Sequence, residues 1–149
     1  MDLVDNCWVG MTVITKTIEI NSKGENDMVD ITDQTLKAIL ESRLENGIVT
    51  IFVSGSTAAV TTIEYEAGLR KDFPMMLNRI IPKGIEYKHD ETWHDGNGHS
   101  HVRASLIGPS LTVPFKDRNL ILGTWQQIVF IELDTRSRER RITLQIIGE

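Results

Sequence analysis

The four histidines of this 149-residue chain all lie between residues 89 and 101. His99 and His101 are separated by one residue at the start of a segment expected to be a strand. Alternation along a strand would put both rings on one face, about 7 Å apart. Imidazole nitrogen is a ligand for zinc and other late first-row divalent metals, and His89 could complete the set. The pattern predicts a metal or phosphate site, and the alternative is a solvated strand end.

Carboxylates that could join these histidines have several interpretations. Glu64 and Glu66 share a face only if their segment is extended, and a carboxylate beside two histidines would complete an open catalytic metal site. Ordinary surface glutamates are the commoner alternative. His94 lies next to Asp95 in a glycine-bounded acidic stretch, which is typical of a solvated loop tip.

A second set of residues has the chemistry to bind an anion. Gly55, Ser56 and Thr57 follow a predicted buried strand, and such turns can direct backbone N–H groups and hydroxyls toward a phosphate. The turn lacks the Gly-Lys-Ser/Thr of a phosphate-binding P-loop, and a plain strand-to-strand turn is the alternative. Lys88 and Arg103, which flank the histidine stretch, could add phosphate contacts. The basic stretch over residues 136–141 is interpreted as a solvated turn or an oligomer contact.

Composition argues against several classes of function. A formal net charge of −5 and a pI near 5.4 disfavour a nucleic-acid surface, which needs basic residues to neutralise phosphates. Cys7 is the single cysteine, so an intramolecular disulfide and a four-cysteine zinc site are excluded. The sequence places no general base beside Cys7, which argues against a role as a catalytic nucleophile. The sequence has no signal-peptide pattern and no run of about 18 apolar residues. We expect a cytoplasmic protein without a membrane or nucleic-acid partner.

The elements that must position these residues begin with a strand over residues 11–20, which is rich in β-branched residues. Residues 36–44 have helical spacing. Asp30 or Thr32 is the expected cap of this helix, and residues 46–47, Asn-Gly, are its expected stop.

The middle of the chain predicts a buried strand over residues 48–53 and an extended segment over residues 59–63. Residues 74–81 predict a helix with its proline in the first turn. The polar, glycine-punctuated stretch over residues 85–98 predicts a loop.

The remainder of the chain reads as strands joined by short polar turns. We expect strands over residues 101–107, 111–115, 120–122, 125–133 and 140–147. Turns this short favour an antiparallel meander, and Trp125 is expected to be buried. The predicted fold class is α+β, a mainly antiparallel, sandwich-like sheet domain with two or three short helices, and the length fits one domain over residues 1–149.

Several motifs together resemble the YjbQ family, the secondary thiamine-phosphate synthases. The longest is GHSHVRASLIGPSLTVP over residues 98–114, followed by LGTWQQI over residues 122–128. The resemblance also takes in Thr57-Ala58-Ala59, Glu64, residues 70–73 and Tyr87-Lys88-His89, and so spans most of the chain.

The resemblance implies a large antiparallel sheet, assembly as a homotrimer, and a pocket near subunit contacts that gathers histidine and glutamate residues. It also implies a secondary activity that joins hydroxymethylpyrimidine diphosphate to thiazole phosphate. In that activity His101 and Glu64 would be catalytic, and His89, His99 and His101 would bind a divalent metal, Mg²⁺ during activity or bound Zn²⁺ or Ni²⁺. The alternative is a non-catalytic homotrimer that binds a metal or a small phosphorylated molecule.

The sequence departs from the family pattern at Gly55, where many members carry a histidine. One imidazole that the resemblance implies is therefore missing. A glycine amide at this position could approach an anion more closely.

Overall fold

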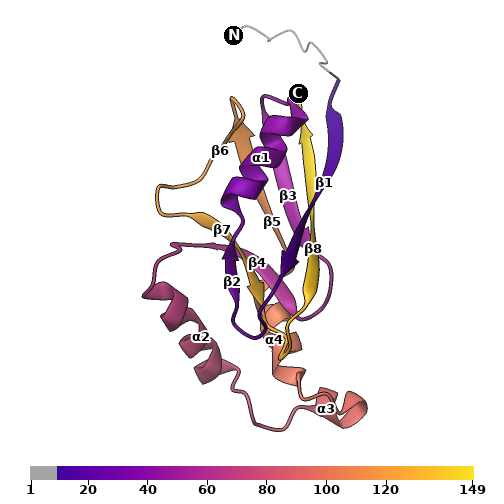
Figure 1. The fold of residues 1–149 in the computed structure, drawn as a ribbon, viewed down its shortest axis with the longest axis vertical. Coiled ribbons are helices and arrows are strands. Elements are labelled where there is room, and N and C mark those ends of the chain that lie inside the picture. The colour runs from indigo at the N-terminus through magenta and orange to yellow at the C-terminus, as the bar shows by residue number, and fades with distance from the viewer. Residues whose placement is uncertain (1–9) are drawn as a thin grey trace, which may run out of the picture.

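The computed structural model describes residues 10–149, and its elements form three layers (Figure 1). The first layer is a five-stranded antiparallel sheet. Its strands, in spatial order, are β1 (Thr12–Asn21), β8 (Glu139–Gly148), β3 (Gly47–Val53), β5 (Ser110–Lys116) and β6 (Asn119–Leu120). Successive side chains of each strand point to opposite faces of the sheet, and within residues 10–149 only one of these faces is covered.

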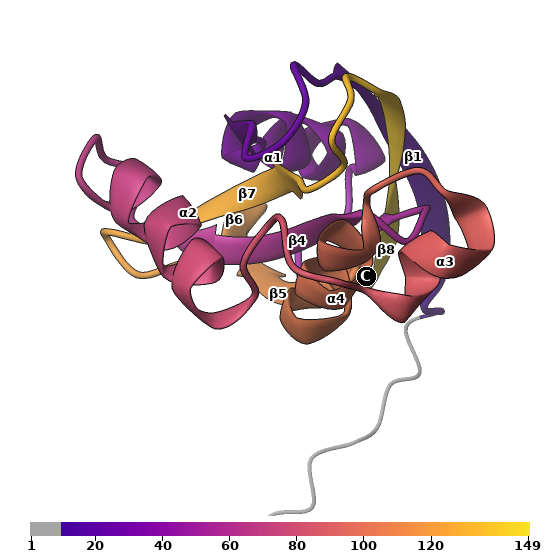
Figure 2. The same ribbon diagram turned by 90° about the horizontal axis from the view of Figure 1, so that it is seen from below.

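The second layer packs on that covered face. It consists of helix α1 (Thr32–Ser42) and a three-stranded antiparallel sheet in the order β2 (Met28–Asp30), β7 (Gln127–Glu132) and β4 (Ala58–Ile63). Figure 2 shows α1 lying alongside β7. The main core fills the space between the two layers, where Ile39 of α1, Ile51 of β3 and Phe130 of β7 are fully buried.

The third layer covers the other face of the three-stranded sheet. It contains α2 (Leu69–Ile80) and α4 (Gly98–Ile107), and α3 (Lys88–Trp93) precedes α4. Leu77 of α2 and Ala104 of α4 join Ile131 of β7 in a second apolar cluster. Strand β7 is buried on both faces because it lies between the two clusters.

Two antiparallel sheets and four short helices in the described residues confirm the α+β fold class. The predicted strands over residues 11–20, 48–53, 59–63, 111–115 and 140–147 all form. The meander is wrong, because β8 inserts between β1 and β3 and the three-stranded sheet is separate. The strand predicted over residues 120–122 is reduced to β6, and the one over residues 125–133 to β7.

The predicted helices differ from the structure at their ends. Helix α1 starts after Ile31, which makes no side-chain cap, but Oδ1 of Asp30 accepts the amide of Thr32, the first helical residue, at 2.9 Å. The helix ends before Arg43, whose φ of 64° is left-handed. The hydroxyl of Thr32 instead accepts the amide of Ile128 at 2.8 Å, joining the helix to β7. Helix α2 begins at Leu69, so Pro74 lies inside the helix and leaves one carbonyl without its usual donor.

The largest correction concerns residues 101–107, which are helix α4 and not a strand. The buried residues of α4 are Gly98, His99, Ser100, Arg103 and Ala104, a spacing that marks one face of a helix. The stretch expected to be a loop contains α3.

Two further expectations concern single residues. Trp125 is 70% exposed, so its predicted burial is wrong. Cys7 lies outside the described residues. None of the helices in residues 10–149 is long and apolar enough to cross a membrane.

Candidate functional site

The histidines gather at the end of the molecule where α3 and α4 lie beside the turn from β7 to β8 (Figures 1 and 2). His99 and His101 are both in α4. Two positions along an α-helix turn the chain by about 200°, so the rings point to nearly opposite sides. The predicted pair on one strand face is therefore wrong, and the two histidines have different surroundings.

His99 belongs to a buried network of charged groups. Its side chain is 2% exposed, and its Nε2 lies 3.1 Å from Oε1 of Glu25, in the turn between β1 and β2. Arg103, one helical turn later, is 0% exposed and donates from Nη1 to the same oxygen at 3.0 Å. Its Nε and Nη2 donate to the carbonyl of Ile81, and Nη2 also donates to Asn78. Every nitrogen of the Arg103 guanidinium is engaged, so the residue predicted to bind phosphate instead holds α4 in place.

The charges of this network shift the ionisation of its members. Burial raises the pKa of the Glu25 carboxyl, but Lys83, His99 and Arg103 outweigh it and bring the pKa below the ordinary 4.5. Burial lowers the pKa of His99 below the ordinary 6.5, against the charge of Glu25. A neutral His99 beside an ionised Glu25 donates its Nε2 proton to that carboxylate.

His101 faces the other way and packs against His89 of α3, with ring centroids 4.2 Å apart. The Nε2 of His89 lies 3.8 Å from Oδ1 of Asp95, which is longer than a hydrogen bond. Both atoms are buried and have no hydrogen-bond partner. Burial, followed by the neighbouring His89, lowers the pKa of His101 below 6.5, so this ring is neutral at physiological pH.

Unpartnered polar atoms are concentrated in this part of the chain. Of five buried side-chain oxygen and nitrogen atoms without a partner in the described residues, four lie between residues 89 and 100. They belong to His89, Asp95, Asn97 and Ser100. Buried polar groups are normally hydrogen-bonded, and a cluster of exceptions marks a place where an ion, water or ligand is expected.

Two of the predicted site residues lie apart from this cluster. Lys88 has a 79% exposed side chain and is paired with Glu86 and Glu91 on the surface. Glu64 follows the far end of β4 and lines a hollow of about 380 Å³ with Trp125. Ala58, at the start of β4, lines a hollow with Ala104 of α4, and the length of β4 separates this end from Glu64 by roughly 20 Å. One chain therefore does not bring Glu64 to the histidines of α4.

The predicted anion-binding turn lies against a cluster of buried charges. Thr57 donates its hydroxyl to Asp134 at 3.2 Å and accepts from Nη2 of Arg140 at 2.9 Å. Glu132, which is fully buried, receives two hydrogen bonds from Arg140. Gly55, with φ +114°, faces the same arginine, and a Cβ there would lie 2.8 Å from its Nη1.

Sequence reasoning missed this charge cluster. The arginines of residues 136–141 are expected to form a solvated turn or an oligomer contact. Exposure suits Arg141 for either role, but the side chain of Arg140 is only 10% exposed because it is buried within the chain itself. A usable signal existed, because Glu132 and Asp134 lie two residues apart, as do Arg138 and Arg140. Across a hairpin, this spacing can place two carboxylates against two guanidinium groups. Glu25, far away in sequence, carried no such signal.

The predicted metal ligands fit an ion only in part. The 3.8 Å between His89 Nε2 and Asp95 Oδ1 is within the roughly 4 Å that two ligands can span when each is about 2.1 Å from one metal ion. Within residues 10–149, no three side chains of His, Cys, Asp or Glu converge on one point. His99, bound to Glu25, is not among the available donors.

Comparison with known proteins identifies the family of this chain. The family model described as UPF0047 protein YjbQ-like matches residues 16–149. The chain belongs to the YjbQ/UPF0047 family. A UPF0047 protein of Methanothermobacter thermautotrophicus is 36% identical over 143 residues, covering 96% of this chain and 98% of the relative. YugU of Bacillus subtilis, another UPF0047 protein, is 30% identical over 89% of this chain and 98% of the relative.

Solved structures of YjbQ-like proteins share the fold. A YjbQ-like protein of unknown function from Sulfolobus solfataricus superposes with a TM-score of 0.86 at 37% identity, covering 94% of this chain and 100% of that one. A hypothetical protein from Aeropyrum pernix gives a TM-score of 0.83 at 30% identity, covering 91% and 99% of the two chains. These likenesses confirm the family that the sequence motifs indicated, and they assign no reaction to it.

Proposed function

We propose that His89 and Asp95, oriented by His101, bind a divalent cation, and that this site recruits a small phosphorylated substrate. The observation that carries the proposal is the pair of buried, unpartnered atoms, His89 Nε2 and Asp95 Oδ1, 3.8 Å apart. Imidazole and carboxylate are common ligands of Zn²⁺ and other late divalent metals.

The chemistry of the unpartnered atoms favours a cation over a bare phosphate. The carboxylate of Asp95 and the amide oxygen of Asn97 are acceptors, which repel an anion and attract a metal ion. Lys88 and Arg103, the cations expected to hold phosphate, are already paired with carboxylates. A phosphate bound here would therefore be held through the metal.

The reaction proposed for the site is the one implied by the family resemblance, thiamine-phosphate synthesis. A carbon–nitrogen bond forms between the pyrimidine methylene and the thiazole nitrogen as the carbon–oxygen bond to diphosphate breaks. A bound divalent cation would stabilise the charge that develops on the leaving diphosphate. Neutral His101 would fix the ring of His89 by packing, and His99 would position α4 through Glu25.

A non-catalytic binding protein is the second candidate function. It is favoured by Gly55, which replaces the histidine that the resemblance implies for many members. No imidazole from this turn is available to complete a catalytic set, and the guanidinium of Arg140 lies beside the vacant Cβ position.

We also propose that the protein assembles as a homotrimer through the uncovered face of the five-stranded sheet, here called the open face. Three cross-strand rows form its uncharged part: Val13, Ile147, Ile48 and Pro114; Thr15, Gln145, Thr50 and Thr112; and Thr17, Thr143, Phe52 and Ser110. Of these residues, Val13, Ile48 and Phe52 are 61%, 40% and 42% exposed. The next row on the same face, Glu19 opposite Arg141, is charged and bounds this part. Depletion of charge is the compositional mark of the centre of a protein interface.

Calorimetric titration of metal-stripped protein with Zn²⁺ and Ni²⁺ tests the metal site. We expect stoichiometric binding that is lost when His89→Ala is combined with Asp95→Asn. His94→Asn is the matched control, because His94 is exposed in the same segment and asparagine tolerates its φ of 52°. Equal binding by all three proteins would refute the site.

The reaction is tested by incubating the protein with both thiamine precursors and Mg²⁺ and measuring thiamine phosphate by chromatography. Loss of the ring that orients His89 should lower the rate about 10-fold to 100-fold in His101→Ala. If the unaltered protein forms no more product than His101→Ala while still binding metal, the synthase activity is refuted and the binding protein remains.

A further inference from the structure

Glu64 and the LGTWQQI segment over residues 122–128 are motif residues that take no part in the histidine site. The fold brings them together, about 60 residues apart in the chain, in a hollow at one end of the three-stranded sheet. The hollow has a volume of about 380 Å³, within the range of small-molecule sites. Its wall includes Asp30, Glu64, Tyr65, Glu66, Trp125 and Gln127.

The pairing of the three strands accounts for this convergence. Strands β2 and β4 both run antiparallel to β7, with Asp30 opposite Val129 and Ile63 opposite Gln127, so β2 and β4 end beside the first residues of β7. Alternation puts Asp30 and Gln127 on one face of the sheet, the face on which Val129 and Ile63 join the second apolar cluster. The chain leaves β4 at this edge, where the amide of Tyr65 donates to Oε1 of Gln127 at 2.9 Å.

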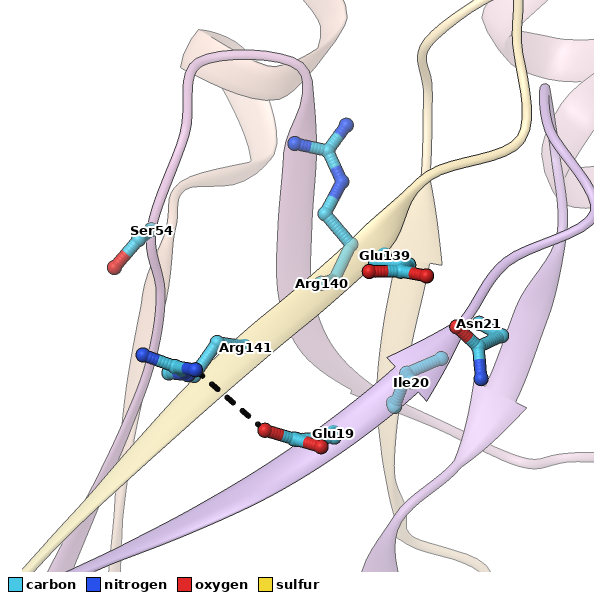
Figure 3. A pocket seen from close by; sticks show the side chains of 7 residues that line it. All are labelled: Glu19, Ile20, Asn21, Ser54, Glu139, Arg140 and Arg141. Carbon is cyan, nitrogen blue, oxygen red and sulfur yellow. Dashed lines mark ion pairs between the residues drawn. The ribbon is translucent and has the colours of Figure 1, made fainter.

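Every side chain in this wall that is charged at neutral pH is a carboxylate. Asp30, Glu64 and Glu66 supply the three carboxylates, and among the described residues no lysine, arginine or histidine lines the hollow. The hollow drawn in Figure 3 differs, because its wall holds two carboxylates and two arginines, and Glu19 pairs there with Arg141 at 3.6 Å. Unbalanced carboxylates in a concave site focus a negative potential, which attracts a cation.

Glu64 is the carboxylate that is open to a ligand. Among the described residues, its side chain has no hydrogen bond and no ion pair. The other two already accept backbone amides: Asp30 accepts one at 2.9 Å, and Glu66 accepts those of Gly68 and Leu69. These two amides hold the pKa of Glu66 below the ordinary 4.5, so its carboxylate is ionised at neutral pH but has fewer free acceptor positions.

Trp125 gives the same wall an aromatic surface. The residue is 70% exposed and lines the hollow beside the carboxylates. The face of an indole attracts a cation more strongly than a phenol or phenyl ring does. Tyr65 already has such a contact, because Cζ of Arg70 lies 4.6 Å from its ring centroid. Trp125 is therefore the ring of this wall that is free to contact a cation from outside the chain.

From these features we infer that the hollow binds a small organic cation that carries a methylated ammonium group. The indole of Trp125 contacts the methyl groups, and the carboxylates supply the opposite charge. Glu64 also accepts a hydrogen bond from a hydroxyl group of the ligand. A methylated ammonium needs no hydrogen-bond acceptor, which suits carboxylates that backbone amides already occupy.

An inorganic divalent cation fits this wall less well. Such an ion needs several ligand atoms that converge within about 2.0–2.6 Å of it, and within residues 10–149 no three acidic or histidine side chains converge in this way. The wider spacing of the carboxylates matches a bulkier cation. The site is independent of the proposed metal site, because the length of β4 separates the two by roughly 20 Å.

The test is calorimetric titration with choline in EDTA-containing buffer, which removes any contribution of a metal at His89 and Asp95. The matched probe is 3,3-dimethylbutan-1-ol, a neutral molecule of the same shape in which carbon replaces the ammonium nitrogen. We expect choline to bind at least about tenfold more tightly than the neutral probe, and its affinity to fall as salt is added. Equal affinity for the two probes, or no saturable binding of choline, would overturn the inference.

Variants of the wall make the test specific. We expect Trp125→Ala to weaken choline binding about tenfold or more and Glu64→Gln about threefold. Trp93→Ala, at a 68% exposed site on α3, and Glu19→Gln, whose side chain is 76% exposed, are the controls and should change the affinity by less than about twofold.

Circular dichroism and light scattering check that each variant keeps the fold and the mass of the unaltered protein. A loss of choline affinity then reports on the hollow itself, and not on unfolding or dissociation. A folded Trp125→Ala that retains full affinity for choline, or a loss as large in Trp93→Ala as in Trp125→Ala, would also overturn the inference.

Discussion

Proton binding by the histidines of α4 is coupled to folding. His99 and His101 both have pKa values below the ordinary 6.5, with burial as the largest cause. A base with a lowered pKa binds fewer protons in the folded than in the unfolded state, so stability rises with pH wherever the two differ. The free energy of unfolding that each neutral ring contributes is fully present above about pH 6.5. It is lost as the pH falls from there through the pKa of the folded state.

We therefore predict that the free energy of unfolding, measured by urea titration, falls between pH 7.5 and pH 5.5. The loss is at most about 1.4 kcal/mol per histidine, because pH 5.5 lies one unit below the ordinary value. His99→Gln should reduce this pH dependence, and the exposed His94→Asn should leave it unchanged. An identical pH dependence in both variants and the unaltered protein would contradict the coupling.

A second loss of stability belongs to the carboxylates. Burial raises the pKa of Asp134, but Arg138 and Thr57 outweigh it, and the pKa lies below the ordinary 3.8. Glu25 is likewise below 4.5. Their contributions are present above these ordinary values and are lost as the pH falls through the folded pKa, so the free energy of unfolding should fall a second time below about pH 4.5.

At the scale of elements, sequence patterns predicted most strands and failed at α4. Residues 48–53 form a short apolar run that is typical of a buried strand, and they lie in β3. Residues 140–147 alternate in a way that is typical of a strand, and they lie in β8. In α4 the alternating His99, His101 and Arg103 resemble a strand, whereas the buried set follows helical spacing. That spacing is hidden in the sequence, because two of its members, His99 and Arg103, are polar and are buried in contact with Glu25, which is distant in sequence.

Glu25 is the contact that joins the β1–β2 turn to α4. Replacing it with alanine would leave Arg103 buried without its carboxylate, and breaking a buried pair in this way typically costs about 3–5 kcal/mol. We predict that Glu25→Ala lowers the free energy of unfolding by an amount in this range in urea titrations. Glu19→Ala, which removes the exposed partner of Arg141, should change it by less than about 1 kcal/mol. Comparable losses in the two variants would show that the network carries little of the stability.

At the scale of the whole molecule, the layer order and the open face were beyond reach of the sequence. Strand periodicity indicates which residues share a face, but the insertion of β8 between β1 and β3 depends on long-range pairing. The same limit applies to the candidate site. Sequence spacing selected His89 and His101, which do meet, but it also joined them to Glu64, which the length of β4 keeps away.

The open face leads to a prediction about assembly. Phe52→Lys places a charge in the last of the three uncharged rows, on strand β3, and burying an unpaired charge at an interface is unfavourable. We predict that the unaltered protein elutes as three 16.9 kDa chains in light-scattering chromatography and that Phe52→Lys elutes as a monomer. Met75→Lys, at a 51% exposed site on α2, is the control and should leave the mass unchanged. A monomeric unaltered protein, or a trimeric Phe52→Lys, would exclude this face as the interface.

The pairing of Thr12 with Gly148 places the first residue of β1 beside the last of β8, at the end of the sheet away from α3 and α4 (Figure 1). The ten residues of β8 span about 30 Å, and the helices α3 and α4, which carry the candidate metal site, lie beyond the other end of that strand (Figure 1). A biotin or dye attached through a short linker after Glu149 would therefore stand clear of that site. Immobilisation by the carboxyl end thus gives a sensor surface on which metal binding can be measured with every molecule in the same orientation.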